Sequence, residues 1–212
     1  MEPNNLILLD GHALIEHKLG QMRHKDCPHE LFRRRMREIG TLLATVVADD
    51  LQTVPVDIPT PLETAKGKKL ASFPVIVPIL RAGLGFAEGI TAVLTEADIG
   101  HIGLKRDEET LLPESYLTNL PPLAGRDVIV ADPMLATGGS LLKAIEILLA
   151  HGAEERLIQV AALVAAPEGI TAVQAAYPQA RLVIAALDRE LNERGFICPG
   201  LGDAGDRMFG TE

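Results

Sequence analysis

The sequence has no tryptophan, and aromatic residues make up only 3% of its 212 residues. Surfaces on which unpaired bases could stack are therefore few. Basic residues are also in the minority, with a net charge of −9, whereas nucleic-acid binders carry an excess of them to displace counterions. These shortages argue against a nucleic-acid partner, although a few well-placed arginines could still bind a small anion.

Only two cysteines are present, Cys27 and Cys198, and their separation excludes a metal-spaced cluster. We expect both to be free thiols in a reducing compartment. The N-terminus has no basic segment and too short an apolar run for a signal peptide. The longest apolar stretches are broken by charge, proline or glycine before they reach membrane-spanning length. The expectation is a cytoplasmic protein with no membrane contact.

Three of the six histidines, His12, His17 and His24, lie near the N-terminus and raise the question of a metal site. Their separations of five and seven residues do not bring them onto one helix face. We expect these side chains to be solvated or to lie at an interface, and we expect no metal bound directly by the protein.

Short apolar runs that alternate with helical patterns are the main structural signal in the chain. The expected strands are residues 74–80, 98–106, 127–132, 156–166 and 181–188. The expected helices are residues 28–52, 86–97, 140–150 and 168–177. Strands that are apolar on both faces and alternate with helices form parallel sheets covered on both sides. The sequence therefore predicts an α/β fold with about five parallel strands flanked by helices, in one domain over residues 1–212.

Three segments interrupt this alternation. Residues 51–69 are rich in proline and polar residues, and we expect a short strand with connections there. Residues 106–126 are too polar and too often broken by proline for a core element, and residues 192–212 contain five glycines without periodicity. Because ligands bind α/β sheets at the carboxyl ends of strands, where loops carry the chemistry, the last two segments are candidate walls of a site.

The strand predicted over residues 127–132 ends in a carboxylate and is followed by small residues and a helix. Asp132 would lie beside the ligand crevice, at the carboxyl end of the strand. The small residues from Ala136 to Ser140 let backbone N–H groups close around a phosphate, to which Thr137 and Ser140 add hydroxyl donors. A carboxylate accepts hydrogen bonds from ribose. The stretch indicates a ribose 5-phosphate site, and the alternative is a structural turn with an incidental aspartate.

The tail contains GLGDAG (200–205), which formally satisfies the dinucleotide-binding pattern GxGxxG. We reject that interpretation because no strand is predicted before it, Pro199 precedes it directly, and only seven residues follow Gly205. A glycine-rich loop instead lets main-chain groups approach a flat ligand.

The stretch ADPMLATGGS (131–140) resembles the phosphoribosyl-diphosphate loop of the type I phosphoribosyltransferases, and its DPMLATGG portion is similar to the uracil phosphoribosyltransferase family. Further similar stretches follow the same order over nearly the whole chain: HALIEHKLGQMR (12–23), VPILRAGLGF (77–86), RDEETL (106–111), LVAAPEGI (163–170) and GFICPGLGDAGDRMFGT (195–211). Most type I relatives have two adjacent acids in the loop, whereas here Ala131 precedes Asp132, which is similar to the uracil enzymes.

This resemblance implies a type I core with a flexible β-arm and a small hood, built from the N-terminal segment and a tail of about residues 189–212. The implied reaction joins uracil to 5-phosphoribosyl diphosphate and gives UMP and diphosphate, with Mg²⁺ carried by the diphosphate. It also implies a role in pyrimidine salvage, a homodimer or higher homo-oligomer, and GTP as an activator in some relatives.

The resemblance also implies a set of site residues. Those for 5-phosphoribosyl diphosphate are Arg81, Arg106, Asp132, Pro133, Met134, Leu135, Ala136, Thr137, Gly138, Gly139, Ser140 and Asp203. Those for uracil are Ile197, Gly202, Asp203 and Ala204. The implied catalytic residues are Asp132, Arg106 and Asp203, with Arg106 on an arm that closes over the substrate and Asp203 reaching Mg²⁺ through water. Independently, Arg81 follows an apolar strand and precedes a glycine turn, so its guanidinium can reach a diphosphate.

Two other functions stay open at this point. One is a regulatory protein of the same fold that binds uridine nucleotides and RNA, which the acidic charge opposes. The other is a phosphoribosyltransferase for a purine base or another pyrimidine.

Overall fold

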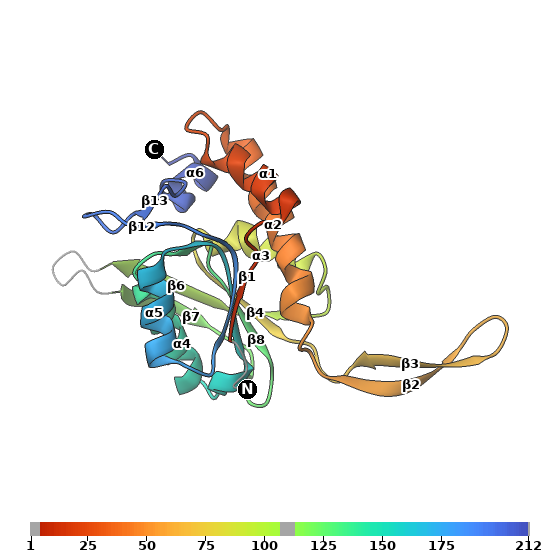
Figure 1. The fold of residues 1–212 in the computed structure, drawn as a ribbon. Coiled ribbons are helices and arrows are strands. Elements are labelled where there is room, and N and C mark those ends of the chain that lie inside the picture. The colour runs from red at the N-terminus through yellow and green to blue at the C-terminus, as the bar shows by residue number, and fades with distance from the viewer. Residues whose placement is uncertain (1–4, 107–112, 212) are drawn as a thin grey trace.

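A computed structural model describes residues 5–106 and 113–211, with only the backbone of Arg106, and these residues contain a nine-stranded sheet (Figure 1). Its order is β1 (Leu6–Leu8), β11 (Arg181–Leu187), β10 (Ile158–Ala165), β8 (Val128–Ala131), β4 (Val75–Leu80), β6 (His101–Arg106) and β7 (Pro113–Asn119). Beside this path, β5 (Asp98–Ile99) pairs with β4 and β9 (Met134–Leu135) with β10. Among these described strands only β6 and β7 pair antiparallel. The five predicted strands are confirmed, with residues 98–106 divided into β5 and β6.

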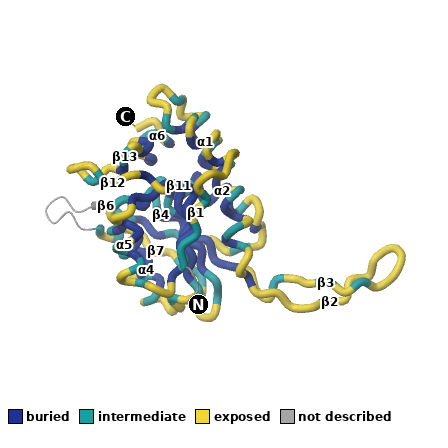
Figure 2. The backbone as a smooth tube through the Cα atoms, viewed as in Figure 1, coloured by how far each residue is buried: buried dark blue, intermediate teal, exposed yellow. Residues whose placement is uncertain are grey.

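Helices cover both faces of the sheet. In the described residues they are α1 (Ala13–Arg23), α2 (His29–Ala48), α3 (Gly83–Thr91), α4 (Gly139–Ala150), α5 (Pro167–Ala176) and α6 (Ala204–Phe209), with a 3₁₀ turn η1 (Glu155–Leu157). Alternate residues of each strand point to opposite faces. Ile76 and Ile129 share a core with α2 and α3, whereas Val128 and Val160 share a core with α4 and α5. Figure 2 shows the central strands as a buried layer, which explains why β4, β8 and β10 are almost entirely apolar.

Helix α3 begins at Gly83, three residues before its predicted start, because glycines that we expected in a turn lie inside the helix. A Cβ atom on Gly83 would lie 2.4 Å from the carbonyl oxygen of Ala131. A Cβ atom on Gly89 would lie 2.0 Å from the carbonyl oxygen of Arg37. Helix α3 therefore packs so closely on β8 and α2 that these positions admit no side chain.

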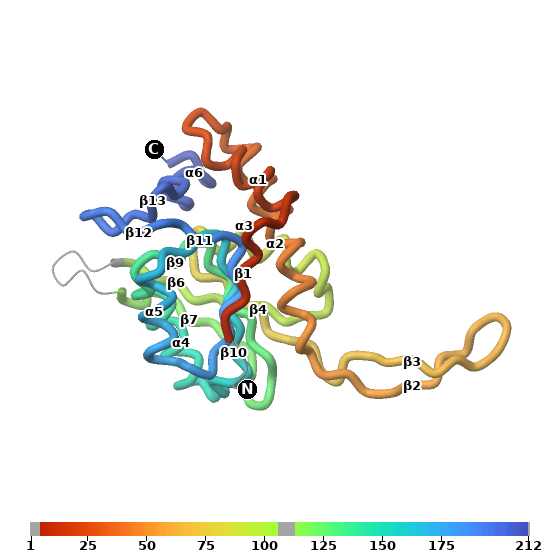
Figure 3. Tube along the Cα trace, in the orientation of Figure 1, coloured from red at the N-terminus to blue at the C-terminus, as the bar shows by residue number. Residues whose placement is uncertain are grey.

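Helix α1 and the C-terminal segment come together beside the carboxyl edge of the sheet, where Figure 3 shows red α1 close to blue α6. The ring of His29 donates a 2.8 Å hydrogen bond to the carbonyl oxygen of Arg207, and Arg33 donates one of 2.8 Å to that of Met208. Residues 192–212, which show no periodicity in the sequence, nevertheless contain short regular elements. The tail contains β13 (Ile197–Cys198), which pairs antiparallel with β12 (Glu190–Leu191), and then α6. These elements are too short to give a sequence period.

A long hairpin projects from the body of the protein (Figure 1). Its strands are β2 (Thr53–Pro59) and β3 (Thr64–Leu70), paired from Thr53 with Leu70 to Pro59 with Thr64. The expectation of a short strand with connections is thus wrong for this segment. Pro55 and Pro59 hid the strand pattern, and they are tolerated because β2 has a neighbour on one side only.

The structure also places the cysteines and histidines considered in the sequence. Both cysteine thiols are free. His12, His17 and His24 are exposed, and no three His, Cys, Asp or Glu side chains in the described residues could hold a metal ion together. Within residues 5–106 and 113–211, no helix combines the length and apolarity needed to cross a bilayer. The cytoplasmic location stays a prediction.

Candidate active site

Adjacent parallel strands bring two predicted site residues to the same edge of the sheet. Pro78 on β4 pairs with Ala131 on β8, so Arg81 and Asp132, which follow these strands, emerge side by side. Both line a cavity of about 370 Å³. The other predicted site residues that line it are Met134, Ala136, Ser140, Ile197, Gly202, Asp203 and Ala204. The cavity therefore joins the loop before α4 to the tail.

The loop before α4 has the geometry of an anion site. Gly138 is the N-cap of α4 with φ +87°, a backbone conformation that favours glycine, and it supplies no capping side chain. The N–H of Gly139 donates to Oγ1 of Thr137 at 3.4 Å. The N–H groups that follow it have no capping side chain, so they can face a ligand at the positive end of the helix. Pro133 anchors the loop to the sheet, because its carbonyl oxygen accepts hydrogen bonds from Leu163 and Val164 at 3.2 and 3.0 Å.

Helix α5 supports this loop from behind through Gly169, a residue that the sequence reasoning did not place in the site. A Cβ atom on Gly169 would lie 2.3 Å from the carbonyl oxygen of Ala136 and 3.0 Å from that of Leu135. Backbone atoms of the loop therefore lie directly on α5. The position and shape of the loop depend on the missing side chain.

Asp132 lies at the floor of the cavity. Burial raises the pKa of its carboxyl group from the ordinary 3.8 to about 7, and one hydrogen bond from the N–H of Met134 to Oδ1, at 3.2 Å, lowers the pKa only in part. In the absence of a ligand the carboxyl group is therefore close to half protonated at neutral pH. Groups that donate hydrogen bonds to it would favour its charged form.

Arg81 reaches across the cavity mouth to α6. Its Nη2 atom lies 3.4 Å from Oδ1 of Asp206, and its guanidinium lies 5.5 Å from the ring centre of Phe209. The Arg81 side chain is 54% exposed, and an exposed ion pair of this length is weak. An incoming polyanion can therefore take the guanidinium away from Asp206.

The tail forms the opposite wall. Ile197 and Ala204 are buried, whereas Gly202 and Asp203 are exposed. Asp203 is the N-cap of α6, and its Oδ1 accepts a 2.9 Å hydrogen bond from the N–H of Asp206. Asp203 therefore caps a helix and also lines the cavity.

Other predicted residues lie beside the cavity or outside the described part. Those that do not line it are Pro133, Leu135, Thr137, Gly138 and Gly139. The side chain of Leu135 is buried in the core between the sheet, α4 and α5, so it can act on a ligand only through its backbone. The side chain of Arg106 and the rest of its arm up to residue 112 lie outside the described residues.

The sequence reasoning missed part of the wall. Arg194, Gly195 and Phe196, in the turn between β12 and β13, line the cavity. Asn192 holds this turn, because its Oδ1 accepts hydrogen bonds from the N–H groups of Arg194 and Phe196 at 3.0 and 2.9 Å. The motif recognised in the sequence, GFICPGLGDAGDRMFGT, begins at Gly195. No periodic pattern of residues indicated that the turn at its start would line the cavity.

The fold and this site define a class, the type I phosphoribosyltransferases: a parallel sheet whose carboxyl edge carries an acid, a glycine-rich loop and a hood. The hypoxanthine-guanine phosphoribosyltransferase of Bacillus anthracis shares the fold, with a TM-score of 0.50 over 76% of this chain and 80% of that one at 14% identity. The AQ2163 protein of Aquifex aeolicus superposes with a TM-score of 0.90 at 36% identity, over 98% of this chain and 99% of that one.

Sequence comparison narrows the class to one family. The profile described as "Uracil phosphoribosyltransferase" matches residues 9–211. The uracil phosphoribosyltransferase of Lactococcus lactis is 50% identical over 207 residues, which cover 95% of this chain and 96% of that protein. That of Anoxybacillus flavithermus is 50% identical over 203 residues, with the same coverage. The chain belongs to the uracil phosphoribosyltransferase family.

Phosphoribosyltransferases of this kind typically depend on Mg²⁺, and the donor groups of the cavity suit an ion that arrives with its substrate. The carboxylates that line the cavity among the described residues are Asp132 and Asp203. Mg²⁺ commonly binds through one or two carboxylates together with substrate phosphates and water, rather than in a cage of protein ligands. The two carboxylates fit this mode.

Proposed function

We propose that this chain transfers the 5-phosphoribosyl group from 5-phospho-α-D-ribose 1-diphosphate to N1 of uracil, giving UMP and diphosphate, within a single domain of residues 1–212. The observation that carries the proposal is one cavity lined by the acid Asp132, the phosphate loop, Arg81 and the glycine-rich tail. Each of these suits a different part of the two substrates, and all lie at one edge of the sheet.

The 5-phosphate would bind the loop from Ala136 to Ser140. Backbone N–H groups at the start of α4 and the hydroxyl groups of Thr137 and Ser140 supply donors, and the helix dipole favours the negative charge. Asp132 would accept hydrogen bonds from the ribose hydroxyls one step further into the cavity. This arrangement fixes the sugar with its anomeric carbon towards the tail.

Uracil would bind along Ile197 and the stretch from Gly202 to Ala204. The edge of the base alternates carbonyl acceptors and N–H donors, which backbone groups of the tail can match. The missing side chain of Gly202, with φ +77°, allows a flat ligand to approach the backbone. Phe196 adds apolar surface at the mouth of the cavity.

In the reaction, N1 of uracil forms a bond to C1 of the ribose while the bond from C1 to the diphosphate oxygen breaks, and its electron pair leaves with the diphosphate. The N1 proton is released to solvent water. Mg²⁺ carried by the diphosphate would neutralise part of the leaving charge. Arg81 would leave Asp206 and bind the diphosphate instead. Arg106, on the arm, would bind the diphosphate as well. Asp132 would steady the positive charge that develops on the ribose.

The test is to incubate the protein with 5-phosphoribosyl diphosphate, Mg²⁺ and one base at a time, with and without GTP, and to separate the products by chromatography. We expect UMP from uracil and no nucleotide from hypoxanthine, guanine or cytosine. If a nucleotide formed from another base, the protein would be a phosphoribosyltransferase for that base. If no UMP formed, the proposed function would be rejected. A salt-sensitive gel shift with RNA would favour the regulatory alternative.

The affinity for UMP is expected to rise as the pH increases through about 7, because the ribose hydroxyls donate to the ionised form of Asp132, whose pKa in the free site is about 7. Binding should therefore release protons, measured by calorimetry in two buffers of different ionisation enthalpy. The phosphate of UMP itself titrates at about pH 6. Proton release measured between pH 7 and 8.5 therefore comes mainly from the carboxyl group of Asp132. The variant Asp132→Asn should release no protons there, and equal release from both proteins would contradict the assignment.

We further propose that the protein is a homodimer held by the projecting hairpin. A two-stranded hairpin is only marginally stable alone, yet β2 exposes the apolar side chains of Val54 and Ile58 by 37% and 42%, and the turn between β2 and β3 exposes that of Leu62 by 96%. A second copy of the chain would cover them.

Removing this hairpin is expected to halve the mass of the particle in light scattering. Thr53 and Leu70 face each other across the hairpin, so an Asn-Gly turn can join them in place of residues 54–69. The circular dichroism spectrum, which should keep its helical signal, serves as the folding control. A truncated protein with the mass of the original would refute this interface.

A further inference from the structure

A buried ion pair ties the end of helix α1 to the end of strand β11. Arg23, the last residue of α1, donates from Nη1 and Nη2 to both carboxylate oxygens of Asp188, at 2.8 and 2.5 Å. The Asp188 side chain is only 4% exposed, and its N–H donates to the carbonyl oxygen of Ala165 at 2.8 Å. The pair is therefore fixed to the sheet on one side.

The Arg23–Asp188 pair also forms hydrogen bonds with the carbonyl oxygen and the N–H group of Gly200. Nη1 of Arg23 donates to the carbonyl oxygen of Gly200 at 2.7 Å, and the N–H of Gly200 donates to Oδ2 of Asp188 at 2.9 Å. Gly200 is buried with φ +61°, and a Cβ atom there would lie 2.1 Å from the carbonyl oxygen of Ile197. One peptide segment is thus held at a single position and orientation.

Gly200 lies between the two parts of the proposed uracil site, Ile197 and Gly202 to Ala204. Arg23 and Asp188 do not line the cavity themselves, so they can act on a ligand only through the tail. Because backbone groups of the tail are proposed to read the base, a small rotation of this segment would misalign several hydrogen bonds together.

We propose that Arg23 and Asp188 are positioning residues for uracil: they fix Gly200 and thereby set the spacing of the backbone groups that read the base. This inference rests on the proposed function. The pair acts on the tail and makes no contact with the phosphate loop, so its loss should weaken recognition of the base much more than binding of 5-phosphoribosyl diphosphate, which would meet the tail only through Asp203.

Two conservative variants test this separately. Arg23→Lys keeps the charge, but one ammonium group cannot replace a planar fork that holds Asp188 and Gly200 at once. Asp188→Asn keeps the shape of the side chain and removes its charge. We expect the KM for uracil to rise about tenfold in each, as for the loss of one or two aligned hydrogen bonds, with less than a twofold change in the KM for 5-phosphoribosyl diphosphate.

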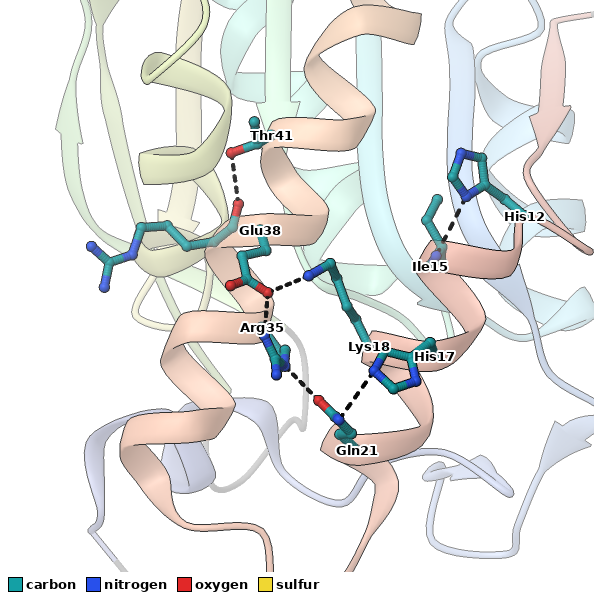
Figure 4. Close-up of polar contacts among 9 residues, drawn as sticks. His12, Ile15, His17, Lys18, Gln21, Arg35, Glu38 and Thr41 are labelled. Atoms are coloured by element: carbon teal, nitrogen blue, oxygen red, sulfur yellow. Dashed lines mark hydrogen bonds and ion pairs between the residues drawn. The ribbon is translucent and has the colours of Figure 1, made fainter.

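The matched control is an ion pair that joins the same helix α1 to α2 and has no contact with Gly200. Glu38 on α2 accepts hydrogen bonds from Lys18 and Arg35, both at 2.6 Å (Figure 4). Burial would raise the pKa of Glu38, but these two cations hold it below its ordinary value. Glu38→Gln should therefore lower the melting temperature without changing the KM for uracil.

Hydrogen exchange of the peptide covering residues 197–204 gives a readout that needs no activity. It should be faster in Arg23→Lys and Asp188→Asn than in Glu38→Gln. Wild-type protein that forms no UMP would remove the proposed function. Active variants with an unchanged KM for uracil, a parallel rise in both KM values, or exchange at wild-type rates would each overturn the positioning role.

Discussion

Replacing Asp132 with asparagine is expected to lower kcat/KM for UMP formation by about 100-fold or more. An amide keeps the shape of the carboxylate, but it accepts hydrogen bonds through one oxygen only and brings no negative charge to the ribose. Steady-state kinetics with both substrates varied measures the loss. Asp26→Asn, at an exposed position outside the cavity, is the control and should have wild-type kinetics.

The same substitution is expected to stabilise the empty protein at alkaline pH. The pKa of Asp132 is about 7 in the folded protein against an ordinary value of 3.8. Its contribution to stability is therefore complete below pH 3.8 and is lost as the pH rises through about 7. The melting temperature of Asp132→Asn should thus exceed that of the wild type at pH 8 by more than at pH 5. Equal differences at both pH values, together with normal kinetics, would remove Asp132 from the site.

The variant Gly169→Ala is expected to reduce kcat/KM for 5-phosphoribosyl diphosphate by about 100-fold, the loss typical of a site displaced by about 1 Å. Its new Cβ atom would lie 2.3 Å from the carbonyl oxygen of Ala136, so the phosphate loop or α5 must move. Steady-state kinetics with 5-phosphoribosyl diphosphate varied at saturating uracil measures this loss.

Gly20→Ala is the matched control for this substitution. Gly20 also lies inside a helix, and a Cβ atom there would have no atom within 4 Å. Alanine favours a helix over glycine by about 1 kcal/mol, so this variant should be as stable as the wild type or more so, with unchanged kinetics. A Gly169→Ala protein with normal kinetics would show that the loop adapts without cost.

Much of the site could be predicted because its chemistry is local in the chain. Asp132 ends an apolar strand, and the small residues after it leave room for an anion, so a short window of sequence carries both signals. The reaction could be predicted because several motifs, in the same order along the chain, resemble those of one enzyme family. The position of Arg81 could be predicted for the same reason. It directly follows a buried strand, and residues at the ends of parallel strands lie at the carboxyl edge of the sheet.

The misses share a physical cause. Gly83 was interpreted as a turn because a glycine can serve a turn or a close contact, and only its neighbour in space, Ala131, distinguishes the two. The hairpin over residues 53–70 was hidden by prolines that a strand paired on one side tolerates. Helix α6 was missed because six residues are too few to show a helical period.

The sequence alone determined the strand and helix alternation, the phosphate loop and the family, because those signals are carried by hydrophobic patterns and neighbouring residues. Only the tertiary structure decided which distant residues support the site. That Arg23 meets Asp188 and Gly200, and that Gly169 meets Ala136, follows from how α1 and α5 pack on the sheet. The raised pKa of Asp132 was likewise decided there, because burial depends on everything that surrounds the carboxyl group.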